Sequence, residues 1–110
     1  MIEDTIARIE ARLKNSSNLS AEQRNELLAL LSTLKGELAS LSQTNAEQAH
    51  RISGFVEASA HEVARDDHQP QVLQQAVDGL SRSVLGMEIR HPKLTDAVNS
   101  ICTVLSNAGI

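Results

Sequence analysis

An acidic and a basic side chain that could exchange protons lie three residues apart in the last third of the chain. Glu88 and His91 precede Pro92, and a carboxylate beside an imidazole can act as a general acid–base pair. No second acid and no nucleophile accompanies them nearby in the sequence, whereas Pro92 fits the first turn of a helix with His91 as its N-cap residue. The structural interpretation is therefore favoured, and the sequence predicts that the protein is not an enzyme.

The same turn carries a small group of positive charges. Arg90, His91 and Lys93 flank the expected helix start, where free backbone amides and the helix dipole favour an anion such as phosphate. Glu88 lies next to these cations and no glycine-rich loop precedes the helix, so a solvated charged turn is the favoured interpretation. A small anion or ligand site at these three residues is the second functional hypothesis.

The histidines show no spacing typical of a metal site. His61 begins a segment like the zinc-protease helix motif, but Arg65 stands where the second histidine ligand belongs. Glu57 and His61 lie four residues apart, whereas the di-iron bundle motif places glutamate and histidine three apart. His50 and His68 add no close pair. The sequence therefore predicts no metal and no cofactor, and it favours solvent-facing roles for these side chains.

Cys102 is the single cysteine of the chain, so no internal disulfide can form. It flanks an apolar stripe that includes Ile101 and Leu105, where a free thiol usually packs as a small inert side chain. No neighbour that would activate it as a nucleophile is visible in the sequence. The first residues lack the positive region of a signal peptide. We therefore expect a cytoplasmic protein.

Composition indicates an ordinary globular domain. The 110 residues fit one helical domain, residues 1–110, in which 41% of the residues are hydrophobic and 22% are charged. The net charge is −4 with neutral histidines, and Phe55 is the only aromatic residue. Because nucleic-acid binders usually have a basic face or aromatic stacking platforms, nucleic acid is not an expected partner. No apolar run approaches the roughly 20 residues that span a bilayer, so no membrane partner is expected.

The elements that must position these residues are amphipathic helices. Apolar residues recur at helical spacing in residues 2–14, and Ser20 with Gln23 forms the capping-box pattern that opens a second helix. Pro70 fits the first turn of a further helix, and Pro92 fits the first turn of the last one. The sequence predicts an all-α fold, a helical bundle of four or five amphipathic helices with coiled-coil-like aliphatic seams.

The most extended apolar pattern is a seam between residues 27 and 55. Its members alternate at intervals of four and three residues, and the same rhythm passes through two polar positions. The seam comprises Leu27, Leu31, Leu34, Leu38, Leu41, Asn45, Gln48, Ile52 and Phe55. Such a stripe is buried against other helices, either of a second chain or of the same chain, and the sequence leaves both alternatives open.

The polar stretch of residues 42–48 controls the shape of the molecule. It lacks a large apolar side chain, so it fits a loop between two helices, with Thr44 and Glu47 as a second capping box. It also fits a polar layer in one long central helix, in which Asn45 and Gln48 would fix the register of a coiled coil. The seam keeps its phase across the stretch, which slightly favours the long helix. Such a helix of about 45 residues would be ~67 Å long and would imply a homodimer.

An ordered set of residues runs through the last third of the chain to its end. The set comprises Glu88, His91, Pro92 and Leu94, followed by Asn107-Ala108-Gly109-Ile110. It resembles a family of small bacterial proteins of unknown function, whose members carry a Phe-Glu-x-x-His-Pro-x-Leu element and end in Gly-Ile. Met87 stands where those members have the phenylalanine. The resemblance implies a short, all-helical, cytoplasmic protein, and it implies no activity.

The leading functional hypothesis is a non-enzymatic helical interaction or assembly module. Burial of the seam by knobs-into-holes packing would join two copies of the chain in a homodimer, or join the chain to another helical protein. The sequence names neither the partner nor the pathway.

Overall fold

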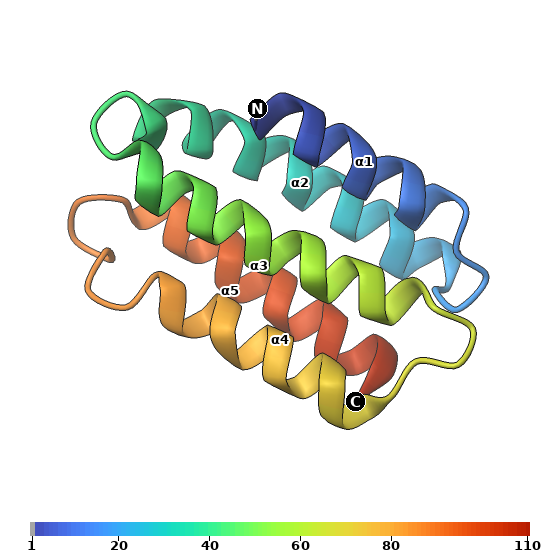
Figure 1. The fold of residues 1–110 in the computed structure, drawn as a ribbon. Coiled ribbons are helices and arrows are strands. Elements are labelled where there is room, and N and C mark those ends of the chain that lie inside the picture. The colour runs from blue at the N-terminus through green and yellow to red at the C-terminus, as the bar shows by residue number, and fades with distance from the viewer. Residues whose placement is uncertain (1) are drawn as a thin grey trace.

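The computed structural model describes residues 2–110, which fold into five α-helices (Figure 1). The helices are α1 (Ile2–Lys14), α2 (Ala21–Ser42), α3 (Ala46–Ala64), α4 (Pro70–Ser83) and α5 (Pro92–Gly109). No strand occurs among the described residues. The prediction of an all-α bundle is therefore confirmed.

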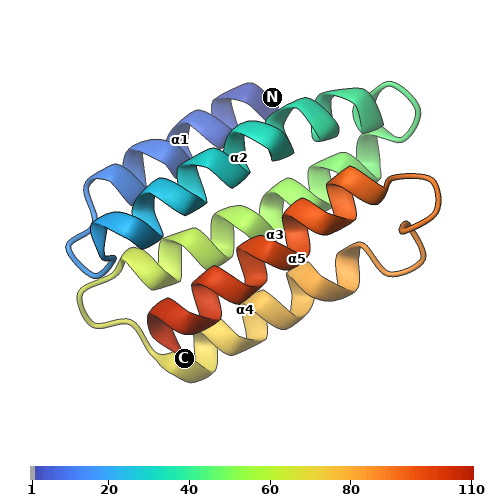
Figure 2. The ribbon, with the colours of Figure 1, turned by 180° about the vertical axis from the view of Figure 1, so that it is seen from behind.

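The helices form two layers. Helices α1, α3 and α4 lie side by side in one layer, and α2 and α5 lie behind them (Figures 1 and 2). Successive helices run in opposite directions, so α1 and α3 are parallel neighbours. The α2–α3 turn and the α4–α5 loop meet at one end of a molecule that measures 38 × 23 × 21 Å. Both connections that carry candidate polar residues therefore lie at the same end.

The leucine stripe of α2 lies inside the bundle. Leu34 and Leu38 have no exposed surface, and Leu27, Leu31 and Leu41 expose at most 3% of theirs. All five belong to a single aliphatic core that also receives side chains from the other four helices. Of the two alternatives for the seam, the intramolecular core therefore describes these leucines, and they leave no surface for a second copy of the chain.

The α3 part of the seam also packs within the chain. Ile52 is fully buried, and Phe55 is half-buried against the core. The Phe55 ring lies over Gly79 of α4, where an added Cβ would stand only 2.5 Å from a ring carbon. Because glycine has no side chain at this point, α4 can approach α3 closely enough to cover the ring.

Of the two alternatives for residues 42–48, the loop between two helices is correct, and the slightly favoured single long helix is wrong. Helix α2 ends at Ser42 and α3 begins at Ala46. Asn45 is the N-cap of α3, and its side-chain oxygen accepts a hydrogen bond from the Gln48 backbone amide at 3.1 Å, so the cap lies one residue after the predicted Thr44. The turn contains no large apolar side chain that needs burial, and folding back allows α3 to cover the α2 stripe. A helix of ~67 Å would exceed the longest dimension of the molecule, 38 Å.

Because Asn45 caps the N-terminus of α3, we expect Asn45→Ala to destabilise the protein. The substitution is expected to lower the free energy of unfolding by about 1 kcal/mol, because the α3 N-terminus loses its side-chain acceptor. The mass in solution should not change, because Asn45 is not part of a polar layer between chains. Urea denaturation followed by circular dichroism measures the first effect, and light scattering the second. Ser17→Ala, at an exposed position of the α1–α2 loop, is the control, and an altered mass of the Asn45 variant would contradict the assignment.

The α1–α2 loop is fixed by the predicted cap and by one arginine. The capping box is confirmed, since Gln23 N donates to Ser20 Oγ at 3.0 Å and Ser20 N donates to Gln23 Oε1 at 3.1 Å. Arg24 then donates from its guanidinium to the carbonyls of Leu13 at 3.2 Å and Ser16 at 2.7 Å. These bonds hold the end of α1 against the start of α2.

Candidate functional site

A hollow of about 650 Å³ lies where the α2–α3 turn meets the α4–α5 loop. Asn45 and Gln48 line it from one side, and Arg90 and His91 line it from the other. The fold thus brings together two groups that the sequence placed in separate hypotheses, the polar pair of the seam and two residues of the predicted anion site. Lys93, the third of those cations, is exposed outside this lining.

The α4–α5 loop, residues 84–91, is contacted by Gln48 of α3 at the end of α4 and at Met87. Gln48 Nε2 donates to the Ser83 carbonyl at 2.6 Å and lies 3.6 Å from the Met87 sulfur. Gly86 has a φ of +84°, a left-handed conformation that glycine adopts without strain. The His91 amide donates to the Met87 carbonyl at 2.8 Å. The loop is therefore a defined turn with Met87 packed against the core.

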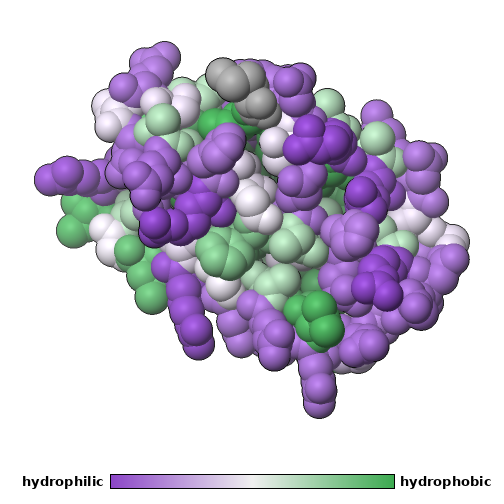
Figure 3. All heavy atoms as spheres, viewed as in Figure 1, coloured by the Kyte–Doolittle hydropathy of each residue, from purple (hydrophilic) through white to green (hydrophobic). Residues whose placement is uncertain are grey.

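Two large apolar side chains face solvent from this fixed loop. Leu85 exposes 70% of its surface and Ile89 exposes 93%, and hydrophobic atoms gather over the loop at the left edge of Figure 3. The other two exposed large apolar residues in the described chain, Val72 and Ile110, are 42% and 51% exposed. Exposed apolar groups that lie together with a polar rim are typical of a protein-binding surface.

The rim of this apolar pair is basic. Within residues 82–96, Arg82, Arg90 and Lys93 are exposed, against two exposed acids, Glu88 and Asp96. The chain as a whole has a net charge of −4, so this end of the α4–α5 hairpin differs in sign from the average surface. The electrostatic potential at this end of the hairpin therefore favours a negatively charged partner.

The structure does not join Glu88 and His91 in an acid–base pair. Glu88 is exposed, and its carboxylate accepts a long hydrogen bond of 3.4 Å from the Gly86 amide. His91 is the N-cap residue of α5, as predicted, but its ring makes no capping hydrogen bond. The absence of enzymatic activity stays a prediction, and so does the anion site at Arg90, His91 and Lys93.

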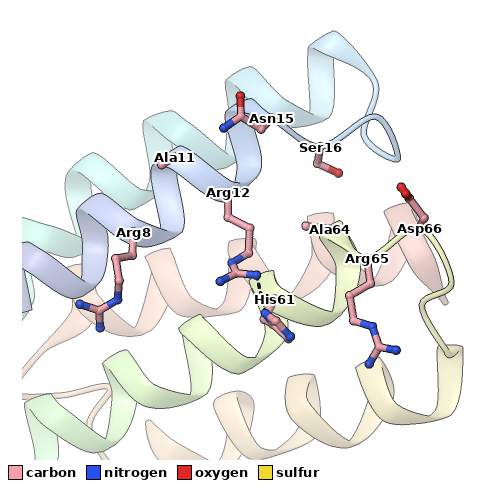
Figure 4. Close-up of a pocket in the computed structure, with 9 residues that line it drawn as sticks. All are labelled: Arg8, Ala11, Arg12, Asn15, Ser16, His61, Ala64, Arg65 and Asp66. Carbon is pink, nitrogen blue, oxygen red and sulfur yellow. Dashed lines mark hydrogen bonds between the residues drawn. The ribbon is translucent and has the colours of Figure 1, made fainter.

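A second hollow, of about 640 Å³, runs between α1 and α3 (Figure 4). Arg8 and Arg12 extend from α1 towards α3, where Arg12 meets His61. Arg65, the C-cap residue of α3, and Asp66 line the hollow at the end of α3. We refer to this hollow, lined by these five residues and their neighbours, as the arginine groove.

Two contacts of equal sequence spacing cross the arginine groove. Arg8 Nε donates to Glu57 Oε2 at 3.0 Å, and Arg12 Nη1 donates to His61 Nδ1 at 2.5 Å, and the partners of each pair are 49 positions apart in the sequence. The equal spacing follows from the parallel packing of α1 and α3. The hydrogen bond with Glu57 raises the pKa of the Arg8 guanidinium. Because a guanidinium has no acceptor, His61 Nδ1 must be the acceptor in the second contact, which requires a neutral ring.

Cys102 is a half-buried thiol on α5. Its sulfur lies 3.8 Å from the Val77 carbonyl, and burial, followed by the nearby Asp78 carboxylate, raises the pKa of the thiol to about 11. Since the thiolate is the reactive form, these features agree with the prediction of a packed and unreactive cysteine.

The raised pKa of Cys102 predicts slow alkylation of the folded protein. At pH 8 the thiol should hold about a hundredth of the thiolate of a thiol with the ordinary value of 9.0. Iodoacetamide labelling followed by mass spectrometry should therefore be about 100-fold slower than in denaturant, and the rate should keep rising up to about pH 11. The unfolded chain binds fewer protons between pH 9 and 11, so the free energy of unfolding should fall across that window. A rate that levels off near pH 9 would contradict the raised pKa.

Within residues 2–110, no three histidine, cysteine, aspartate or glutamate side chains are placed to hold a metal ion. His50 and His61 are exposed, and His68 lies 3.3 Å from the Gly109 carbonyl. None of the five helices combines the length and the apolar character needed to cross a bilayer.

Comparison of the chain with protein-family models, with curated proteins and with solved structures finds no match. The resemblance of residues 80–110 to a family of small bacterial proteins therefore stays a prediction.

Two features of these surfaces were not predicted from the sequence, although each corresponds to a recognisable sequence pattern. Arg8 and Arg12 place like charges one turn apart on α1, an arrangement that destabilises an isolated helix and therefore suggests a partner opposite it. Ile89 stands between Glu88 and Arg90, outside every predicted helical stripe. An apolar residue that lies outside every apolar helix face is expected to be exposed to solvent.

Proposed function

We propose that the chain is a non-enzymatic helical interaction module that binds a partner protein through the α4–α5 loop. The observation that carries this proposal is the exposure of Ile89, at 93%, and Leu85, at 70%, on a loop that Gln48 of α3 contacts at the end of α4 and at Met87. A flexible loop could bury such side chains by folding onto the helical bundle. A fixed loop that keeps them in solvent instead offers two preorganised apolar anchors.

The partner that fits this surface is an apolar segment flanked by carboxylates, such as the exposed face of an acidic amphipathic helix. The exposed cations Arg82, Arg90 and Lys93 surround the anchors, and carboxylates on the partner would complement them. Two copies of this chain meeting loop to loop would instead bring the two groups of cations together. Charge therefore favours a different, acidic helical protein over a homodimer at this surface.

The size of the patch indicates a transient complex. Burying Leu85 and Ile89 contributes about 3–6 kcal/mol before the costs of association. Before those costs, about 3–6 kcal/mol corresponds to dissociation constants of about 6 mM to 40 µM, so a short acidic partner is expected to bind in the millimolar range.

The test uses a synthetic amphipathic helix with leucines on one face and glutamates on the other. We expect it to bind, with chemical-shift changes in an NMR titration confined to the α4–α5 loop and the nearby α2–α3 turn. A peptide with lysine at every glutamate position should bind at least about tenfold more weakly, because its charge matches that of the rim.

Matched variants identify the surface. The double variant Leu85→Ser and Ile89→Ser should weaken binding at least about tenfold without loss of folding, because both side chains are exposed. Val72→Ser, a control at the opposite end of α4, should bind as the parent does. Equal binding of both peptides, or full binding by the double variant, would overturn the proposal. Mass measurements that show a dimer dissociated by the double variant would assign the loop to self-association instead.

A further inference from the structure

We propose that the arginine groove binds a tetrahedral oxyanion, a phosphate or sulfate group, between Arg12 and His61, and that binding takes up a proton on His61. The groove is separate from the α4–α5 loop. It lies between α1 and α3 (Figure 4), and this inference does not depend on the partner of the loop.

The two contacts across the groove differ in their charge balance. In the first, Arg8 is matched by the carboxylate of Glu57. In the second, one turn further along both helices, Arg12 meets the imidazole of His61 in place of a carboxylate. Among residues 2–110, no carboxylate forms an ion pair with Arg12. The second contact therefore joins equivalent positions on α1 and α3 but lacks the negative charge of the first.

None of the other charges around His61 forms an ion pair with Arg12 among the described residues, although one exposed acid, Asp66, lines the same groove. Arg65, at the end of α3, is paired with Asp67 at 3.3 Å and with Glu62 at 3.4 Å. Arg8 with Glu57 lies one turn towards the N-terminal ends of α1 and α3. Arg12 remains the cation of the groove without an acid of its own, and a hollow of about 640 Å³ leaves room for a ligand beside it.

The Arg12–His61 contact couples anion binding to protonation. Nδ1 accepts from Arg12 only while the ring is neutral. Protonation of the ring turns Nδ1 into a donor, breaks this bond and sets two cations face to face. An oxyanion between them accepts from both, because a guanidinium fork and an imidazolium N–H each match tetrahedral oxygen ligands. The anion therefore favours the protonated ring, and the protonated ring favours the anion.

Sulfate is the appropriate first probe, because it remains a dianion from pH 5.5 to 8. At constant ionic strength set with chloride, we expect isothermal titration calorimetry to show sulfate binding about tenfold tighter at pH 5.5 than at pH 8. Titrations at pH 6.5 in two buffers with different ionisation heats should show proton uptake on binding. A peptide with one phosphoserine and its unphosphorylated form distinguish a free anion from a group carried by a protein, since tighter binding of the phosphopeptide than of sulfate assigns the second source.

Three variants separate a built site from general electrostatics. Arg12→Gln should reduce sulfate affinity at least about tenfold. His61→Gln retains a polar side chain that cannot titrate, so weak binding should persist without pH dependence and without proton uptake. Arg51→Gln removes the same charge from an exposed position on α3 and should leave binding unchanged. The proposal is overturned if sulfate has no effect beyond chloride, if Arg51→Gln and Arg12→Gln weaken binding equally, or if His61→Gln keeps the full pH dependence.

Discussion

Leu34→Ala is expected to lower the free energy of unfolding by about 3–5 kcal/mol, enough to leave a domain of this size marginally folded. Leu34 is fully buried in the middle of the α2 stripe, where close-packed neighbours from the same chain can only partly collapse into the space left by the lost carbons. Urea denaturation followed by circular dichroism measures the change. The chain has no tryptophan or tyrosine, so fluorescence is not a suitable probe.

Leu85→Ala is the matched control for this effect. It removes the same atoms from a side chain that is 70% exposed, so the free energy of unfolding should change by no more than about 0.5 kcal/mol. The loss in Leu34→Ala should also be independent of protein concentration, because a core within one chain unfolds in a unimolecular step. A loss that shrinks as the protein concentration rises would show that the stripe is an interface between chains.

Glu62→Leu is expected to have the second largest effect, a loss of about 2–3 kcal/mol. Glu62 is only 4% exposed, and its Oε2 accepts a hydrogen bond from the Gln69 amide at 2.8 Å. Gln69 is the N-cap residue of α4 and makes no side-chain cap of its own, so the carboxylate from α3 serves the start of α4. Removing it leaves a part-buried amide without an acceptor and a helix N-terminus without its negative charge.

Two further variants test the cause of this loss. Glu62→Gln keeps an acceptor oxygen for Gln69 and should cost only about 1 kcal/mol. Glu47→Leu makes the same change on the same helix at a side chain that is 87% exposed and paired with Arg51 at 3.7 Å, so it should cost about 0.5 kcal/mol or less. Equal losses in Glu62→Leu and Glu47→Leu would contradict the role of Glu62 at the α3–α4 connection.

The helices were predictable because each depends on a local signal. Helix α2 begins at a capping box formed by Ser20 and Gln23, which are only three residues apart in the sequence. Helix α5 begins at Pro92, directly after its N-cap residue His91. The end of α2 stayed open between two alternatives, and the wrong one was slightly favoured because the seam keeps its coiled-coil phase through Asn45. Phase describes which face of a helix is apolar, and it does not say whether the covering helix belongs to the same chain. The chain folds back because its own α3 and α5 can cover the stripe.

The candidate surfaces depend on contacts that no local pattern contains. Gln48 appeared to belong to the seam, but its amide reaches Ser83, 35 residues away, and fixes the α4–α5 loop. Arg12 and His61 are 49 residues apart and meet because α1 and α3 pack in parallel with one particular register. The types of these residues were visible in the sequence, whereas their partners follow from the packing of helices that are not consecutive in the chain.

The most direct measurement is the mass and radius of gyration of the protein in solution, by light scattering and small-angle X-ray scattering after size exclusion, with concentration taken from the refractive index. A stripe buried within one chain predicts a monomer of 11.9 kDa with a radius of gyration near the 12.8 Å of its Cα atoms. A dimer of twice that mass with a much larger radius, as a helix of ~67 Å would give, would contradict the single-chain core and return the leucine stripe to the role of an interface.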